Sequence, residues 1–266
     1  DDVAADMTPK ARKHKQTILG FALLGFGTLL VLVIALIPRF LSKAYDPQTL
    51  CLLEVPLQTH VLILVDRTDP LTPLQSVIFR KLLLRERAAL RPHAKLSVFT
   101  VTDTTGVLED QRFSMCSPGH REDANLLYEN PQQVQQFFER RFEEPLDQVI
   151  LDLTGAQVAS QSPIYQSLLK VLRRPDFTWR VPQRRLILLS DLMEHTAAFS
   201  HYNTSKFEIM LTLAPFLAPL DLDQVDLEVY YREFPFKLPD KAQKHQIFWE
   251  ELFRASGAVR QRWFTF

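Results

Sequence analysis

Between Thr17 and Ile37 the chain reads TILGFALLGFGTLLVLVIALI, a run without a charged residue, and no other feature restricts its fold so strongly. A helix needs about 20 apolar residues to cross the core of a bilayer. The alternative is a signal peptide, whose apolar core has about 7 to 15 residues and ends at small residues before a cleavage site. This run is longer and is followed by Pro38 and Arg39. The pattern therefore predicts one transmembrane helix over residues 17–37.

Basic residues on the two sides of this run predict its orientation. The flank that carries more lysine and arginine stays in the cytoplasm. Four basic residues precede the run and two follow it: Lys10, Arg12, Lys13 and Lys15, then Arg39 and Lys43. We therefore expect residues 1–16 to be a cytoplasmic segment of an inner-membrane protein. Residues 38–58 are then a linker, and residues 59–266 a periplasmic domain.

Two cysteines, Cys51 and Cys116, bear on the same question. An even pair in an exported domain predicts one disulfide, which here would tie the linker to the domain. The alternative, two unrelated buried thiols, is the better reading for a cytosolic protein. The disulfide and the predicted topology support each other.

The remainder of the chain alternates apolar β-rich runs with amphipathic helical patterns. Strands are predicted at residues 60–66, 94–102, 184–192, 225–233 and 259–266. Helices are predicted at residues 73–90, 131–146, 162–174 and 240–258. Thr72 and Ser162 are the expected N-caps of the first and third helices, each followed by a proline. This alternation predicts an α/β fold with a mostly parallel, doubly wound, Rossmann-like sheet.

The sequence does not decide the secondary structure of two segments. Residues 111–130 are rich in turn-forming residues and could hold a short edge strand. Residues 148–154, QVILDLT, fit either a strand or a continued helix.

Polar residues gather where the predicted strands end. Asp66 and Asp191 each close an apolar strand, and Ser162 begins a helix. Ligands of open α/β sheets bind at the carboxyl ends of the strands. Carboxylate and hydroxyl oxygens suit a hard cation such as Mg²⁺. Turn formation and helix capping are the alternative roles of these residues.

Three segments, LVDRTDPLT, SQSPIYQSL and LILLSDL, resemble in this order the metal-site segments of von Willebrand factor A-type domains. In this resemblance Asp66 is the first aspartate, Thr68 the first hydroxyl, Ser162 the later threonine and Asp191 the last aspartate. It implies a site for Mg²⁺ or Mn²⁺ in a domain that binds partner proteins without performing chemistry.

The chain departs from that pattern at Pro70, where the family has a second serine. Three alternatives follow: Thr72 reaches into the site instead, a water takes the place of that serine, or the site holds no metal. Asp69 adds a carboxylate that the family motif does not require.

The function expected from these features is a membrane-anchored interaction or scaffold module of a bacterial envelope complex, with other membrane or envelope proteins as partners. The alternative is a phosphotransferase similar to haloacid-dehalogenase-like enzymes, with Asp66 as nucleophile and Ser190 holding the phosphoryl oxygens with Mg²⁺. Thr68 stands where that alternative needs a second acid. Lys and Arg equal Asp and Glu at 31 each, so no global charge favours nucleic acid as a partner.

Overall fold

The computed structural model describes residues 19–33, 36, 43–101, 111–127, 129–153, 159–197, 199–202, 220–232, 239–258 and 260–265. The chain divides into two units: Asp1–Lys43 with Asn125–Asn130, and Ala44–Ala124 with Pro131–Phe266. In the first unit, residues 19–33 are helical and lie within the predicted segment 17–37. None of the helices that the structure describes is long and apolar enough to cross a membrane.

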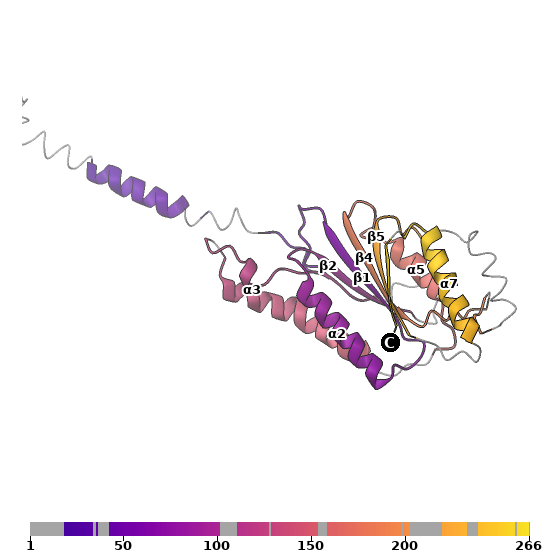
Figure 1. The fold of residues 1–266 in the computed structure, drawn as a ribbon. Coiled ribbons are helices and arrows are strands. Elements are labelled where there is room, and N and C mark those ends of the chain that lie inside the picture. Colours follow the sequence, from indigo (N-terminus) through magenta and orange to yellow (C-terminus); the bar gives the residue numbers. More distant parts are fainter. Residues whose placement is uncertain are drawn as a thin grey trace, which may run out of the picture. The chain divides into compact units, whose positions relative to one another are not determined.

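The second unit is built on a six-stranded sheet with the order β3-β2-β1-β4-β5-β6 (Figure 1). Its strands are β1 (Thr59–Asp66), β2 (Lys95–Val101), β3 (Gln111–Cys116), β4 (Gln183–Ser190), β5 (Val225–Tyr231) and β6 (Gln261–Thr265). All neighbouring pairs are parallel except β2 and β3. The predicted α/β class and mostly parallel Rossmann-like sheet are thus confirmed, and the turn-rich segment supplies the antiparallel edge strand.

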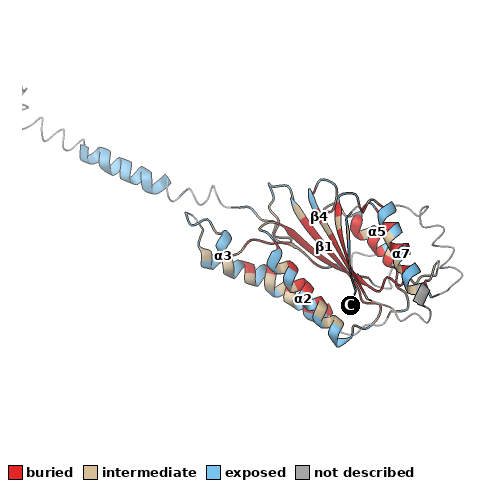
Figure 2. Ribbon diagram, viewed as in Figure 1, coloured by how far each residue is buried: buried red, intermediate tan, exposed pale blue. Residues whose placement is uncertain are grey.

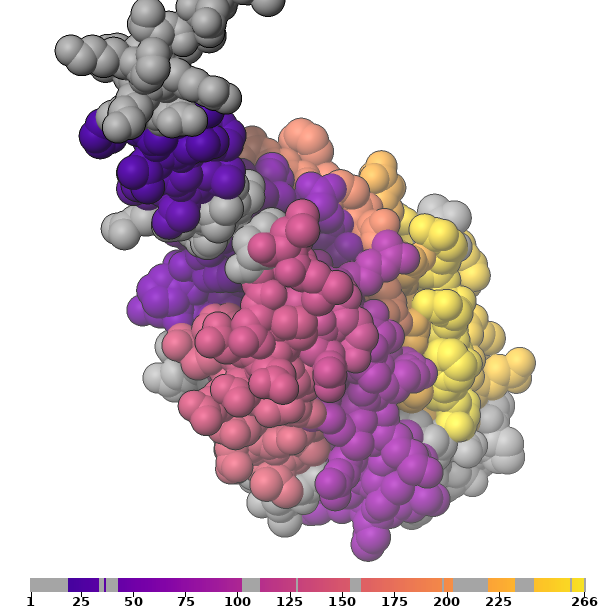
Figure 3. Space-filling view, turned by 90° about the vertical axis from the view of Figure 1, so that its left-hand side faces the viewer, coloured from indigo at the N-terminus to yellow at the C-terminus, as the bar shows by residue number. Residues whose placement is uncertain are grey.

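Helices cover both faces of this sheet (Figure 1). The α-helices are α2 (Pro73–Ala89), α3 (Pro131–Phe138), α4 (Glu144–Leu153), α5 (Ile164–Leu172) and α7 (Pro239–Ala255). A 3₁₀ helix, η2, covers Arg121–Asp123, and a π-helical segment, η3 (Glu139–Glu143), joins α3 to α4. On one face α2 lies beside the helical run 131–153 (Figure 3), and Arg87 pairs with Glu143 at 2.9 Å and Asp147 at 2.8 Å. On the other face lie α5 and α7.

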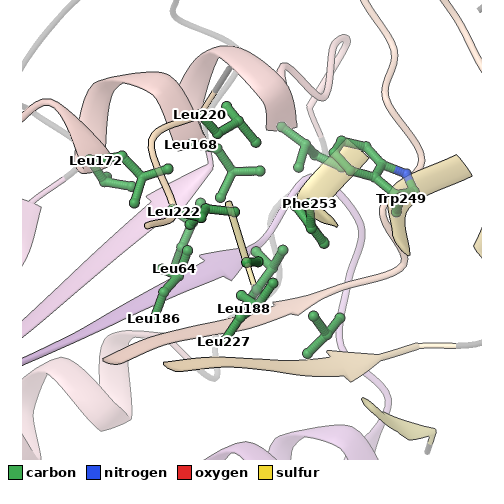
Figure 4. Packing of buried hydrophobic residues seen from close by; sticks show 14 of the residues in the cluster. Leu64, Leu168, Leu172, Leu186, Leu188, Leu220, Leu222, Leu227, Trp249 and Phe253 are labelled. Atoms are coloured by element: carbon green, nitrogen blue, oxygen red, sulfur yellow. The ribbon is translucent and has the colours of Figure 1, made fainter. Parts of the chain in front are cut away.

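The central strands are buried (Figure 2), and their side chains belong alternately to two core clusters, one on each face. Ile63 belongs to the cluster that includes Phe79 of α2 and Phe142 of η3, whereas Leu64 belongs to the cluster that includes Leu168 of α5 and Trp249 of α7 (Figure 4). A strand that is covered on both faces reads as a nearly continuous apolar run, as residues 61–65 of β1 and 186–189 of β4 do.

Local signals agree with the predictions except at one helix start. Thr72 caps α2 in a capping box with Gln75 and Pro73 at the first helical position, as predicted. Residues 148–153 continue α4, so the open segment is helical. The prediction that Ser162 caps the third helix is wrong. The N-cap residue of α5 is Pro163, and its side chain makes no capping hydrogen bond.

The predicted disulfide between Cys51 and Cys116 is confirmed. It joins the segment that precedes β1 to the last residue of β3, and the Cys116 N–H donates to the Thr49 carbonyl at 2.7 Å. Leu50 is buried beside it. Residues 44–58 are therefore part of the compact unit, and they approach the sheet at the amino ends of its parallel strands.

Candidate functional site

The site lies where the direction of the chain's crossovers reverses. From β1 the chain proceeds to β2 on one side, and from β4 to β5 on the other, while β1 and β4 are neighbours. In open α/β sheets this switch point forms a crevice at the carboxyl ends of the strands. Asp66 is the last residue of β1, Ser190 is the last of β4, and Asp191 follows it. We call the surroundings of these residues the carboxyl edge.

Asp66 is held entirely by donors of the protein. Its Oδ1 accepts the Thr68 N–H at 3.0 Å and the Thr68 hydroxyl at 2.7 Å. Its Oδ2 accepts the Ser190 hydroxyl at 2.6 Å. The residue is 2% exposed. Because a buried carboxylate is costly unless it is hydrogen-bonded, these three bonds are what allow Asp66 to close the strand.

Ser162 reaches the same cluster from a distant part of the chain. Its Oγ lies 3.1 Å from the Thr68 hydroxyl. The Ser162 N–H donates to the His195 carbonyl at 2.8 Å, and the His195 N–H returns a bond to Ser162 at 3.0 Å. This two-way bridge fixes the segment before α5 against the segment after β4.

Asp191 is bonded to a residue that the sequence analysis did not select, Arg232. The Arg232 guanidinium donates to Asp191 Oδ2 at 2.7 Å and to Asp69 Oδ2 at 3.3 Å. The other oxygen of Asp191 accepts the Met193 N–H at 2.9 Å. Arg232 directly follows β5, whereas the strand predicted from the sequence continued to residue 233, so the rule that strand ends meet at one edge did not single it out.

Two buried acids, Asp66 and Asp191, lie near the same cation, Arg232. Burial, and then the neighbouring charge of Asp66, raise the pKa of Asp191 to about 6, although Arg232 opposes the shift. Burial disfavours the charge on Arg232, but Asp191 and its hydrogen bond outweigh burial and raise the pKa of Arg232.

Glu194 takes the capping role that was expected of Ser162. Its Oε2 accepts the Tyr165 N–H of α5 at 2.8 Å. Burial, partly offset by the bonds from Tyr165 and Ile164, raises the pKa of Glu194 to about 7. No local signal marks this role, because Glu194 caps a helix 29 residues earlier in the chain.

The structure thus brings together four predicted site residues and separates one from them. Asp66, Thr68, Ser162 and Asp191 converge as predicted, and Asp69 contacts the cluster through Arg232. Thr72 instead accepts the Gln75 N–H at 3.3 Å as a helix cap.

This arrangement does not support the predicted Mg²⁺ or Mn²⁺. A divalent cation needs carboxylate and hydroxyl lone pairs directed at it. Here the Arg232 guanidinium already donates to Asp191 at 2.7 Å and to Asp69 at 3.3 Å, so these carboxylates face a cation that the protein itself supplies. Within the described ranges no three His, Cys, Asp or Glu side chains form a metal-binding group.

The phosphotransferase alternative gains no support either. A nucleophile must reach its substrate, whereas Asp66 is buried with both oxygens accepting hydrogen bonds. The Ser190 hydroxyl, which would hold phosphoryl oxygens, donates to Asp66 itself.

An exposed rim surrounds the buried cluster. Asp69 has a 49% exposed side chain, and Tyr202 is 51% exposed. Burial, followed by the charges of Asp191 and Asp69, raises the pKa of Tyr202 to about 12, so the phenol stays neutral. We call Asp69 and Tyr202 the rim.

A cavity of about 470 Å³ lies at the opposite end of the parallel strands. Cys51, Lys95 and Asp176 are among the residues that line it. We call this region the amino edge.

Comparisons with known proteins assign no family or function to the chain. The sequence matches no protein-family model, and a comparison with curated proteins finds no match. Function is therefore inferred from the chemistry of the site itself.

Proposed function

We propose that this chain is a membrane-anchored, non-catalytic interaction module of a bacterial envelope complex that binds a protein partner at its carboxyl edge. The resemblance to von Willebrand factor A-type domains belongs to this proposal. It is supported by Asp66, Thr68, Ser162 and Asp191 meeting at the switch point of the sheet.

One observation carries the proposal: at the carboxyl edge the buried polar groups are hydrogen-bonded to one another, whereas the rim is accessible to a partner. Both carboxylate oxygens of Asp66 accept hydrogen bonds, one from Thr68 and the other from Ser190. Asp69 and Tyr202 remain accessible around it. Tyrosine and exposed apolar side chains are typical of the centres of protein interfaces.

Rim variants test the proposal in full-length protein isolated from native membranes. Asp69→Arg reverses a charge, and Tyr202→Ala removes an aromatic contact, and neither residue is in the core. Trp179→Ala is the matched control, because Trp179 is 75% exposed and precedes β4 at the amino edge. We expect a stoichiometric partner to co-purify with the wild type and the control and to be lost from both rim variants. A partner retained by both rim variants would contradict the proposal.

The proposed anchor is residues 17–37, with the second unit in the periplasm. The uncharged run, the heavier basic cluster before it and the Cys51–Cys116 disulfide support this placement. Protease added to spheroplasts should degrade the domain while a cytoplasmic marker survives. Protection of the domain until the cells are lysed would contradict the placement.

A further inference from the structure

The geometry points to Arg232 as a built-in replacement for a divalent cation. We propose that its guanidinium occupies the place that a metal would take between the aspartates, so that the carboxyl edge folds and functions without metal. The inference does not depend on the proposed partner, because it concerns the cluster itself.

Position along β5 places Arg232 in the cluster. β5 is parallel to β4 with Ser190 opposite Tyr231, and the Arg232 N–H donates to the Ser190 carbonyl at 3.0 Å. The residue after β5 therefore lies beside the residue after β4, which is Asp191. Backbone pairing, and not a flexible loop, positions the guanidinium.

Charge on three carboxylates converges on this one side chain. Arg232 bonds to Asp191 and Asp69, and the charge of Asp66 also acts on it. Its side chain is only 12% exposed, so water screens these interactions weakly. A guanidinium is always charged and donates in a fixed plane, which makes it a stable stand-in for an ion.

Donors and acceptors in the cluster fit a guanidinium better than a metal. Both oxygens of Asp191 are occupied, by Arg232 and by the Met193 N–H. Pro70 offers no side-chain oxygen where the resemblance places a second serine. A divalent cation beside Asp191 would have to displace the guanidinium from that carboxylate.

Titration with Mn²⁺, followed by the electron paramagnetic resonance signal of the free ion, tests the inference on full-length protein in detergent. The wild type should show no Mn²⁺ site that Asp66→Asn removes. A wild-type site abolished by Asp66→Asn would overturn the inference, whereas binding unaffected by that substitution would lie elsewhere and leave the cluster metal-free, as proposed.

Arg232→Gln provides the converse test, with Arg232→Lys as the matched control that keeps the charge. The glutamine variant should gain one Mn²⁺ site that Asp191→Asn removes in the same background, and the lysine variant should gain none. A folded glutamine variant without such a site would overturn the inference. If circular dichroism shows that the glutamine variant is unfolded, the wild-type titration decides.

Discussion

The carboxyl edge and the amino edge, at the two ends of the parallel strands, differ in how their buried carboxylates are paired with cations. At the amino edge Asp176 is shared by two cations, Lys95 at 2.7 Å and Arg174 at 2.9 Å. Burial opposes the charge on Asp176, but its bonds to Arg174 and Lys95 prevail and hold its pKa well below the usual range. At the carboxyl edge Asp66 and Asp191 share one cation, and the pKa of Asp191 is raised.

Around Asp176 the paired cations outnumber the acid, whereas around Arg232 the acids outnumber the cation. At the amino edge His60 bonds to the Asp176 carbonyl and to Ser97, each at 2.8 Å, and burial lowers the pKa of His60 to about 4. The disulfide closes the same region. An unbalanced acid pair in a crevice is a feature that clusters at functional sites. We therefore propose that the amino edge serves the fold and that the carboxyl edge is the binding region.

Loss of the disulfide should give the largest effect. Cys51 and Cys116 are 65 residues apart, and opening a loop of that size costs about 4 kcal/mol of unfolding free energy in the chain-entropy description. Urea unfolding of the Cys51→Ser/Cys116→Ser variant measures this loss, and reduced wild type is its control. Equal stability of the variant and the oxidised wild type would show that the bond is not holding the amino edge together.

Asp176→Ala should lower the free energy of unfolding by about 3 kcal/mol, because it leaves the buried Lys95 without its partner. Asp226→Ala is the matched control, since Asp226 pairs with the exposed Arg260 and should cost less than about 1 kcal/mol. Denaturant titration measures both. A similar loss in the two variants would remove the distinction between a structural and a surface ion pair.

Acid should affect the two edges in opposite directions. Asp191 has a pKa of about 6 in the folded state against 3.8 as reference, so its contribution to stability is fully present below pH 3.8 and is lost as the pH rises to about 6. Asp176 has a lowered pKa, so its contribution is present above 3.8 and is lost in acid.

Asp191→Asn should therefore become more stable relative to the wild type between pH 4 and pH 6, by on the order of 2 kcal/mol. Asp69, Asp66, Arg232 and Tyr202 surround Asp191 and remain in the variant. Unfolding curves across this range measure the difference between the two proteins. A constant difference would contradict the raised pKa and with it the contrast between the edges.

Thr72→Ala should have the smallest effect, about 1 kcal/mol, because Thr72 caps α2 and is not part of the cluster. Thr72→Ser keeps the cap and should restore most of the loss. Thermal unfolding measures the stability of both variants, and co-purification checks partner binding. If Thr72→Ala lost the partner without losing stability, Thr72 would belong to the partner-binding surface as well as to the rim's surroundings, which would contradict a purely capping role.

Much of the fold follows from sequence because local and global signals agree. The apolar runs ending at Asp66 and Asp191 predict buried parallel strands, and Thr72 with Pro73 predicts a helix start. Residues 148–153 were ambiguous because Val149 and Ile150 suit a strand, whereas packing on the sheet holds them in α4. Tertiary context decides such short apolar runs.

The site was only half predictable for a related reason. Convergence of Asp66 and Asp191 follows from parallel topology alone. The partnership of Arg232 with Asp191 depends on the register between β4 and β5, which no local pattern encodes. Ser162 looked like a cap because a hydroxyl precedes Pro163, but Glu194 supplies the acceptor and frees Ser162 for the cluster.

Site-specific photo-crosslinking in living cells tests the central claim most directly. A photoreactive amino acid replaces Tyr202 at the rim in one strain and Trp179 at the amino edge in another. We predict a discrete crosslinked protein adduct at position 202, unchanged by a metal chelator, and none at position 179. An adduct formed only at position 179 would contradict the assignment of binding to the carboxyl edge.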